Sequence, residues 1–75
     1  MKTKVIKSYN NEDESMCVDI FVRPDGSWGF EQYRRDFEEG RWFPISNYQS
    51  GTYSDESAVR KEAAKEISWF RIQHG

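Results

Sequence analysis

The chain has 75 residues, a formal net charge of −2, and an aromatic content of 16% supplied by three Trp, four Tyr and five Phe. This length predicts one domain over residues 1–75, with a small core in which the large rings provide much of the buried area. The acidic balance excludes a global electrostatic attraction to nucleic acid or to anionic membranes. No apolar run approaches the roughly 20 residues that span a bilayer.

The cysteine content and the first residues bear on the compartment. Cys17 is the only cysteine, so the chain cannot form an internal disulfide, which suits a reducing compartment. The opening residues MKTKVIKSYNNEDE contain lysines but no apolar segment typical of a signal peptide. We therefore expect a cytoplasmic protein that does not associate with membranes.

The first half of the chain predicts three strands, over residues 2–9, 16–23 and 27–35. The clearest is MCVDIFVR, in which period-two alternation divides the side chains between two faces. One face carries Met16, Val18, Ile20 and Val22, and the other carries Cys17, Asp19, Phe21 and Arg23. The sequence RPDGS then predicts a tight turn, because Pro24 fixes φ, Asp25 bonds locally and Gly26 tolerates a positive φ.

The second half predicts a further hairpin and a helix. DFEEG, residues 36–40, is typical of a hairpin loop, and residues 41–48 follow as a fourth strand. Pro44 donates no hydrogen bond, which favours an edge position. One helix is expected over residues 55–72, with Ser54 as its N-cap, a Glu56–Arg60 pair, and one apolar stripe. The stripe consists of Val59, Ala63, Ile67 and Phe70.

The order β-β-β-β-α with short loops predicts an α+β fold. We expect a three- or four-stranded antiparallel meander sheet with one C-terminal helix packed on one face. Alternation assigns a single core to the helix side of the sheet. Its expected members are Val18, Ile20, Trp28, Phe30, Phe43, Ile45, Val59, Ala63, Ile67 and Phe70.

The same alternation leaves aromatic residues on the face that one helix cannot cover. They are Phe21, Tyr33, Trp42 and Tyr48, with Arg23, Arg35, Asp19 and Glu31 among them. Two interpretations stay open. Cross-strand aromatic and aromatic–Arg pairs can simply brace an open sheet. A contiguous aromatic patch with a charged rim is also typical of a binding or self-association face.

The sequence offers few groups for catalysis or metal binding. His74 is the only histidine, and its place at the expected frayed end of the helix predicts an exposed side chain. A Cys17–His74 nucleophile pair would need a cleft and a third orienting group. A closed zinc site usually needs four Cys or His ligands, and Glu12, Asp13 and Glu14 lack the spacing of a calcium loop. We expect no enzyme activity, metal or cofactor.

Two resemblances accompany these patterns. The run PDGSWGFEQYRRDFEEGRWFPISNYQSGTYSDESAVRKEA, within about residues 24–64, resembles a pattern in short uncharacterised bacterial proteins, which carry no assigned activity. WGFEQYRRD, RWFPISNY and the Ser54-led helix also resemble the arm-binding amino-terminal domain of tyrosine-recombinase integrases. That resemblance implies a three-stranded sheet that enters the DNA major groove. Pro44 and Glu31 depart from it, because a DNA-facing sheet favours hydrogen-bond donors.

The sequence as a whole indicates a non-catalytic module that binds a protein partner or a second copy of itself through the open sheet face. The expected binding residues are Phe21, Tyr33, Trp42, Tyr48, Arg23 and Arg35. The alternative is a nucleic-acid-binding sheet of the integrase-arm kind. Strands three and four bring no local surplus of positive charge, so we expect nucleic acid to bind weakly.

Overall fold

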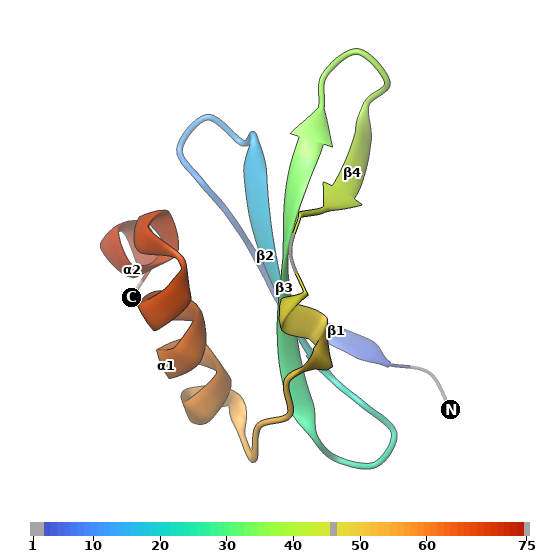
Figure 1. Cartoon of the computed structure of the whole chain (residues 1–75), viewed down its shortest axis with the longest axis vertical. Coiled ribbons are helices and arrows are strands. Elements are labelled where there is room, and N and C mark those ends of the chain that lie inside the picture. The colour runs from blue at the N-terminus through green and yellow to red at the C-terminus, as the bar shows by residue number, and fades with distance from the viewer. Residues whose placement is uncertain (1–2, 46, 75) are drawn as a thin grey trace.

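A computed structural model describes residues 3–45 and 47–74, which form a four-stranded sheet with two helices on one of its faces (Figure 1). The sheet is an antiparallel meander in the order β1-β2-β3-β4. The α+β fold predicted from the sequence is therefore confirmed, with two helices in place of one. The elements are β1 (Lys4–Asn10), β2 (Met16–Val22), β3 (Trp28–Asp36), β4 (Arg41–Pro44), the 3₁₀ turn η1 (Tyr48–Ser50), α1 (Glu56–Glu66) and α2 (Ser68–His74).

The two predicted hairpin turns lie where their sequences indicate. Gly26 and Gly40 have φ values of +88° and +70°, a region that glycine adopts at little cost. Asp25 Oδ1 accepts hydrogen bonds from the backbone N–H and the hydroxyl of Ser27. Asp36 Oδ1 similarly accepts from the N–H of Glu38 at 3.0 Å. Local side-chain bonds of this kind stabilise both reversals of the chain.

The core lies between the sheet and the helices. Ile20 is directly opposite Phe30 across β2 and β3, so the two side chains share the helix-facing side. The buried cluster consists of Val18, Ile20, Phe30, Val59, Ala63, Ile67 and Phe70, all predicted from strand alternation or from the apolar stripe of the helix. Trp28 is only half-buried and packs at the margin of this cluster.

Strand four is shorter than predicted, and the expected core positions at its end are wrong. It ends at Pro44, although the N–H of Ile45 still bonds the carbonyl oxygen of Gln32 at 3.2 Å. Because α1 packs on β2 and β3, Phe43 within β4 is only half-buried and Ile45 is 42% exposed. Tyr48 instead supplies the ring that stacks on Phe30, with centroids 4.9 Å apart. Ser46, within the predicted strand, lies outside the described residues.

The segment after η1 is fastened to the end of β3. Trp28 and Tyr53 exchange two backbone hydrogen bonds, each 2.9 Å long. The N-cap of α1 is then Asp55, not the predicted Ser54, because Asp55 Oδ1 accepts from the N–H of Ala58 at 2.8 Å. The helix therefore starts only three residues beyond a point fixed on the sheet.

The predicted continuous helix is interrupted at Ile67, which has extended backbone angles. Its N–H still bonds Ala63 O at 2.8 Å, so α1 is completed before the chain turns into α2. The break allows α2 to lie against β1. The Phe70 and Tyr9 rings pack edge to face, with their centroids 5.1 Å apart. A His74 ring nitrogen lies 2.8 Å from the carbonyl oxygen of Asn10.

Three smaller expectations also change. The first strand begins at Lys4 and ends at Asn10, and the predicted start at Lys2 lies outside the described residues. Glu56 forms a salt bridge with Lys7 of β1, with Oε2 3.4 Å from Nζ, in place of the predicted pair with Arg60. His74 is half-buried, because the rings of Tyr9, Trp69 and Phe70 surround it.

The helices in the described part of the chain are short. α1 has 11 residues and α2 has 7, whereas crossing a bilayer takes about 20 apolar residues. Neither of them could span a membrane.

Candidate binding face

The face of the sheet opposite the two helices, called the open face below, is covered by neither α1 nor α2 (Figure 1). Strand pairing fixes its membership. Asp19 lies opposite Ser8 on one side and Glu31 on the other, and Cys17 lies opposite Asn10 and Tyr33. Trp42 joins them from β4, opposite Arg35. Residues from all four strands therefore meet on this face.

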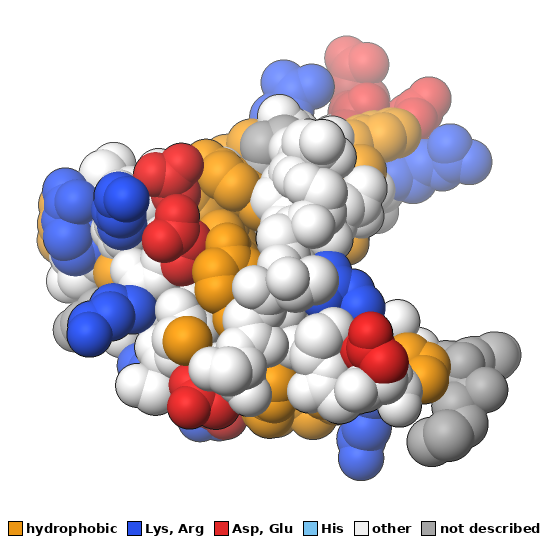
Figure 2. Space-filling model, turned by 60° about the horizontal axis from the view of Figure 1, so that its bottom comes forward, with side chains coloured by type: hydrophobic (Ala, Val, Ile, Leu, Met, Phe, Trp, Pro, Cys, Tyr) orange, Lys and Arg blue, Asp and Glu red, His pale blue; other side chains and the backbone are white. Residues whose placement is uncertain are grey.

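The open face contains a hollow with a volume of about 360 Å³, called the Trp42 hollow below. It is lined by Ser8, Asn10, Cys17, Asp19, Tyr33 and Trp42. A second hollow of similar size adjoins it and shares Asp19 and Tyr33. Figure 2 shows the molecule hollowed on the side away from the helices. Such a concave, partly aromatic surface can enclose a side chain of a partner.

The floor of the Trp42 hollow is acidic. Asp19 Oδ1 accepts hydrogen bonds from the Ser8 hydroxyl at 2.7 Å and from the Cys17 thiol at 3.2 Å. Burial, together with the bond to Asp19 and its charge, raises the pKa of Cys17 to about 12. Burial also raises the pKa of Tyr33, with further contributions from the negative charges of Asp19 and Glu31.

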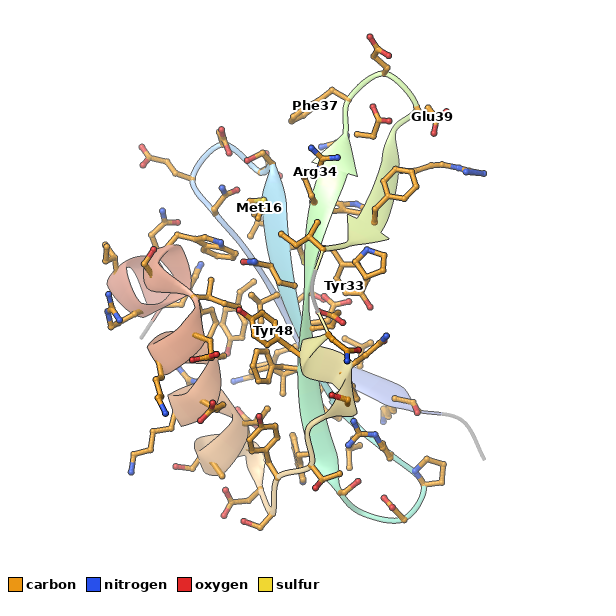
Figure 3. All side chains as sticks on the ribbon, viewed as in Figure 1. Met16, Tyr33, Arg34, Phe37, Glu39 and Tyr48 are labelled. Atoms are coloured by element: carbon orange, nitrogen blue, oxygen red, sulfur yellow. The ribbon has the colours of Figure 1, made fainter. Side chains whose placement is uncertain are left out.

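The wall formed by Trp42 is held in place by cation–π contacts. The guanidinium carbon of Arg35 lies 5.8 Å from the centre of the Trp42 ring and 5.3 Å from that of Phe37. Trp42 remains 40% exposed and Phe37 remains 66% exposed. The protruding β3–β4 hairpin, on which Figure 3 labels Phe37, therefore leaves both aromatic rings partly exposed to solvent.

Phe21 and Arg23 serve a structural role at the other end of the open face. Phe21 lies opposite Gly29 and is only 9% exposed. The Arg23 guanidinium covers the Phe21 ring at 5.0 Å. It also donates to four oxygens, which are Ser27 Oγ, Trp28 O, Gln49 O and Gly51 O. These bonds attach residues 49–51 to the sheet.

Glu31 is also on the open-face side of β3, yet its side chain is fully buried. One carboxylate oxygen accepts from the N–H of Gln32 at 2.8 Å, and the other from the N–H of Gln49 at 3.4 Å. The segment after β4 therefore covers this carboxylate. A buried carboxylate needs such donors to offset the loss of hydration.

The structure brings together some of the predicted site residues and separates others. Tyr33 and Trp42 line the Trp42 hollow, and Arg35 lies beside it. Phe21 and Arg23 line the second hollow, but both are engaged in packing or hydrogen bonds. The expectation that Tyr48 lies on the open face is wrong, because η1 points it at Phe30 in the core (Figure 3).

Four residues of the hollow were not among the binding residues expected from the sequence: Ser8, Asn10, Cys17 and Asp19. Cys17 and Asp19 had been placed on the correct face by alternation in β2. Ser8 and Asn10 depend on the register of β1, which shifts between Val5 and Lys7. No simple alternation along residues 2–9 could locate that shift.

Cys17 and His74 do not form a catalytic pair. Cys17 lies on the open face, whereas His74 packs among Tyr9, Trp69 and Phe70 on the helix side. The raised pKa of Cys17 also keeps its thiol protonated at neutral pH. A protonated thiol is a poor nucleophile.

Comparison with known proteins gives no match to a protein-family model, a curated protein or a solved structure. Function must therefore be inferred from the residues of this chain. The open face offers the most developed combination of concavity, exposed aromatic rings and charge.

Proposed function

We propose that the protein is a non-catalytic module that binds a protein partner, or a second copy of itself, through the open face. The observation that carries this proposal is the Trp42 hollow, with Trp42 exposed at its wall and Tyr33 half-buried in its lining. Trp and Tyr are residue types that often dominate the energy of protein interfaces. We place the module in the cytoplasm, where the single thiol of Cys17 would stay reduced.

The distribution of contacts supports a binding role for only part of the open face. The Arg23 guanidinium packs on the Phe21 ring and donates hydrogen bonds to the 49–51 segment, so these contacts stabilise the fold. Trp42 and Phe37 keep large exposed surfaces on a hairpin that projects from the sheet. We therefore centre the interface on Trp42 and Tyr33, with Arg35 and Phe37 at its rim.

Nucleic-acid binding by the same face is the weaker alternative. A DNA-binding surface gains most of its affinity from positive charge placed against phosphates. Here Asp19 lies in both hollows of the open face, and the Arg23 guanidinium is occupied by oxygens of the chain itself. An acidic floor would repel a phosphate backbone.

Sedimentation over a concentration series tests the proposal for self-association. Trp42→Ala and Tyr33→Ala should each weaken association by roughly 1–4 kcal/mol while the protein stays folded. Ile72→Ala is the matched control, because Ile72 is an exposed aliphatic residue on α2, 78% accessible, and lies outside the open face. If only Ile72→Ala weakens association, the interface lies on the helices instead.

For a chain that stays monomeric, a photo-crosslinking residue can replace Asn10 at the edge of the hollow or Ile72 on α2. We expect a defined protein adduct in cells from position 10, none from position 72, and loss of the adduct when Trp42→Ala is added. Crosslinking that is unaffected by Trp42→Ala would contradict a binding role for the hollow.

A further inference from the structure

We infer that the Trp42 hollow takes up a basic side chain, a lysine ammonium in the first instance, from the bound partner. This inference rests on the proposed function and specifies the chemistry of the partner. The hollow combines two aromatic side chains, Tyr33 and Trp42, with the carboxylate of Asp19. Aromatic faces attract cations through their quadrupole, and a carboxylate adds charge and a hydrogen-bond acceptor.

Asp19 retains the capacity to bind an incoming donor. Its Oδ1 atom accepts from Ser8 and Cys17. Its Oδ2 atom accepts no hydrogen bond from residues 3–45 or 47–74. The two bonds at Oδ1 fix the carboxylate in place, so little side-chain freedom would be lost when a cation binds.

The nearby arginines form no ion pair with Asp19 within the described residues. Arg23 lies at the second hollow and is held by four oxygens of the chain. Arg35 lies over the Trp42 and Phe37 rings and does not line the Trp42 hollow. Consistently, burial raises the pKa of Tyr33, and the negative charges of Asp19 and Glu31 add to this rise.

The size of the hollow suits a single side chain. A volume of about 360 Å³ is at the lower end of the range for ligand sites. The flanking residues Ser8 and Asn10 add polar groups that can contact the backbone or the amide of a bound segment. A partner that presents one exposed lysine on a projecting loop or chain end fits this arrangement.

Titration with two blocked amino acids, followed by amide chemical shifts, tests the inference. The probes are Nα-acetyl-lysine N-methylamide and its Nε-acetylated, uncharged form. We expect the charged probe to give saturable shifts at residues 8, 10, 17, 19, 33 and 42, with millimolar affinity. The neutral probe should bind at least about fivefold more weakly, because it lacks the cation.

Matched variants separate charge in the hollow from overall charge. Asp19→Asn should weaken binding of the lysine probe at least about fivefold, whereas Glu39→Gln removes the same charge from the exposed hairpin loop (Figure 3) and should have no effect. Trp42→Phe should retain more binding than Trp42→Leu.

Equal binding of both probes, or unchanged affinity in Asp19→Asn, would overturn the inference and point to an apolar occupant. The proposed function is tested separately. If Trp42→Ala abolishes association while the lysine probe gives no shifts, the open face is an interface that does not recognise a cation.

Discussion

At the scale of single residues, Gly29 determines how one end of the open face is built. A Cβ atom at this position would lie 2.7 Å from the Phe21 ring and 2.8 Å from the Arg23 guanidinium. The absent side chain therefore leaves the space in which Phe21 lies flat on β3 and Arg23 covers it. No described helix covers this face. Phe21 is nevertheless buried there, because it lies against Gly29 and beneath the Arg23 guanidinium.

Gly29→Ala should accordingly lower the free energy of unfolding by about 1–3 kcal/mol, as expected when a packed site is overfilled. Alanine is the better residue in an ordinary strand, so propensity alone predicts the opposite sign. Urea denaturation measures the change. In a Phe21→Ala background the cost of Gly29→Ala should largely disappear, and an unchanged cost would show that ring packing is not its cause.

The thiol of Cys17 provides a second test at this scale. Its pKa in the folded protein, about 12, exceeds the ordinary value of 9.0. The folded state therefore holds this proton more tightly than the unfolded state. Its contribution to stability is complete below pH 9 and is lost as the pH rises from about 9 towards 12.

Alkylation with iodoacetamide at pH 8 should consequently be slower by on the order of a hundredfold or more in the folded protein than in denaturant. A cysteine moved to the exposed helix surface, as in Cys17→Ser with Ser57→Cys, should react at an ordinary rate. Asp19→Asn should speed the reaction of Cys17, because the bond to Asp19 and its charge both raise the pKa. Rapid labelling of the folded parent protein would contradict the buried, protonated state.

At the scale of elements, η1 replaces the missing half of β4. β4 pairs with β3 only from Tyr33 to Asp36. Beyond that point η1 packs Tyr48 on Phe30 and brings Gln49 to Glu31. One short turn thus covers a core ring on the helix side and a carboxylate on the open-face side of the same strand.

Tyr48 and Trp42 should therefore respond differently to truncation. Tyr48→Ala is expected to cost about 1–3 kcal/mol of stability, because it uncovers Phe30 in the core. Trp42→Ala should cost less than about 1 kcal/mol, since Trp42 is 40% exposed. Parallel urea titrations compare the two, and Phe30→Ala, expected to cost about 2–5 kcal/mol, gives the scale for a core ring. A reversed order would contradict the assignment of the two faces.

The elements also show how far the sequence could predict the fold. Alternation in β2 and the turns at Gly26 and Gly40 were sufficient to place Val18, Ile20 and Phe30 in the core. Alternation failed after Pro44. Beyond the end of β4, odd and even positions no longer point to opposite faces of the sheet. No Pro or Gly near Ile67 indicates the break between the helices in the sequence. The break is associated with contacts of α2 with β1, which only the structure shows.

The candidate site was predictable to a similar degree. Tyr33, Trp42 and Asp19 follow from strand parity within β2, β3 and the paired part of β4. The shared role of Phe21 and Arg23 depends on the empty position at Gly29, which becomes visible only when the strands are in register. Burial of Glu31 depends on a turn 17 to 19 residues further along the chain.

At the scale of the whole molecule, the distribution of charge limits the partners. The protein has a net charge of −2. The open face, which the resemblance to integrase arm-binding domains would direct to DNA, has Asp19 in both of its hollows. The positive groups near it are engaged with aromatic rings or backbone oxygens.

Duplex DNA should accordingly bind with a dissociation constant of about 10 μM or weaker at physiological salt, within the range of non-specific association. Fluorescence polarisation with a labelled duplex measures it at two salt concentrations. Asp19→Lys serves as a positive comparison, because it adds positive charge at the centre of the open face and should strengthen binding. Sub-micromolar affinity that falls steeply with salt would instead support the nucleic-acid alternative.

The paired hydrogen bonds between Trp28 and Tyr53 have a consequence for assembly. Only residues 54 and 55 separate this clamp from the start of α1. To pack its helices on another copy's sheet, as in a swapped dimer, the chain would have to break these bonds or open at residues 54 and 55, and the helices would first have to leave their own core. A dimer that joins two completed folds through the open face should instead form and dissociate quickly on dilution, without such an unfolding step.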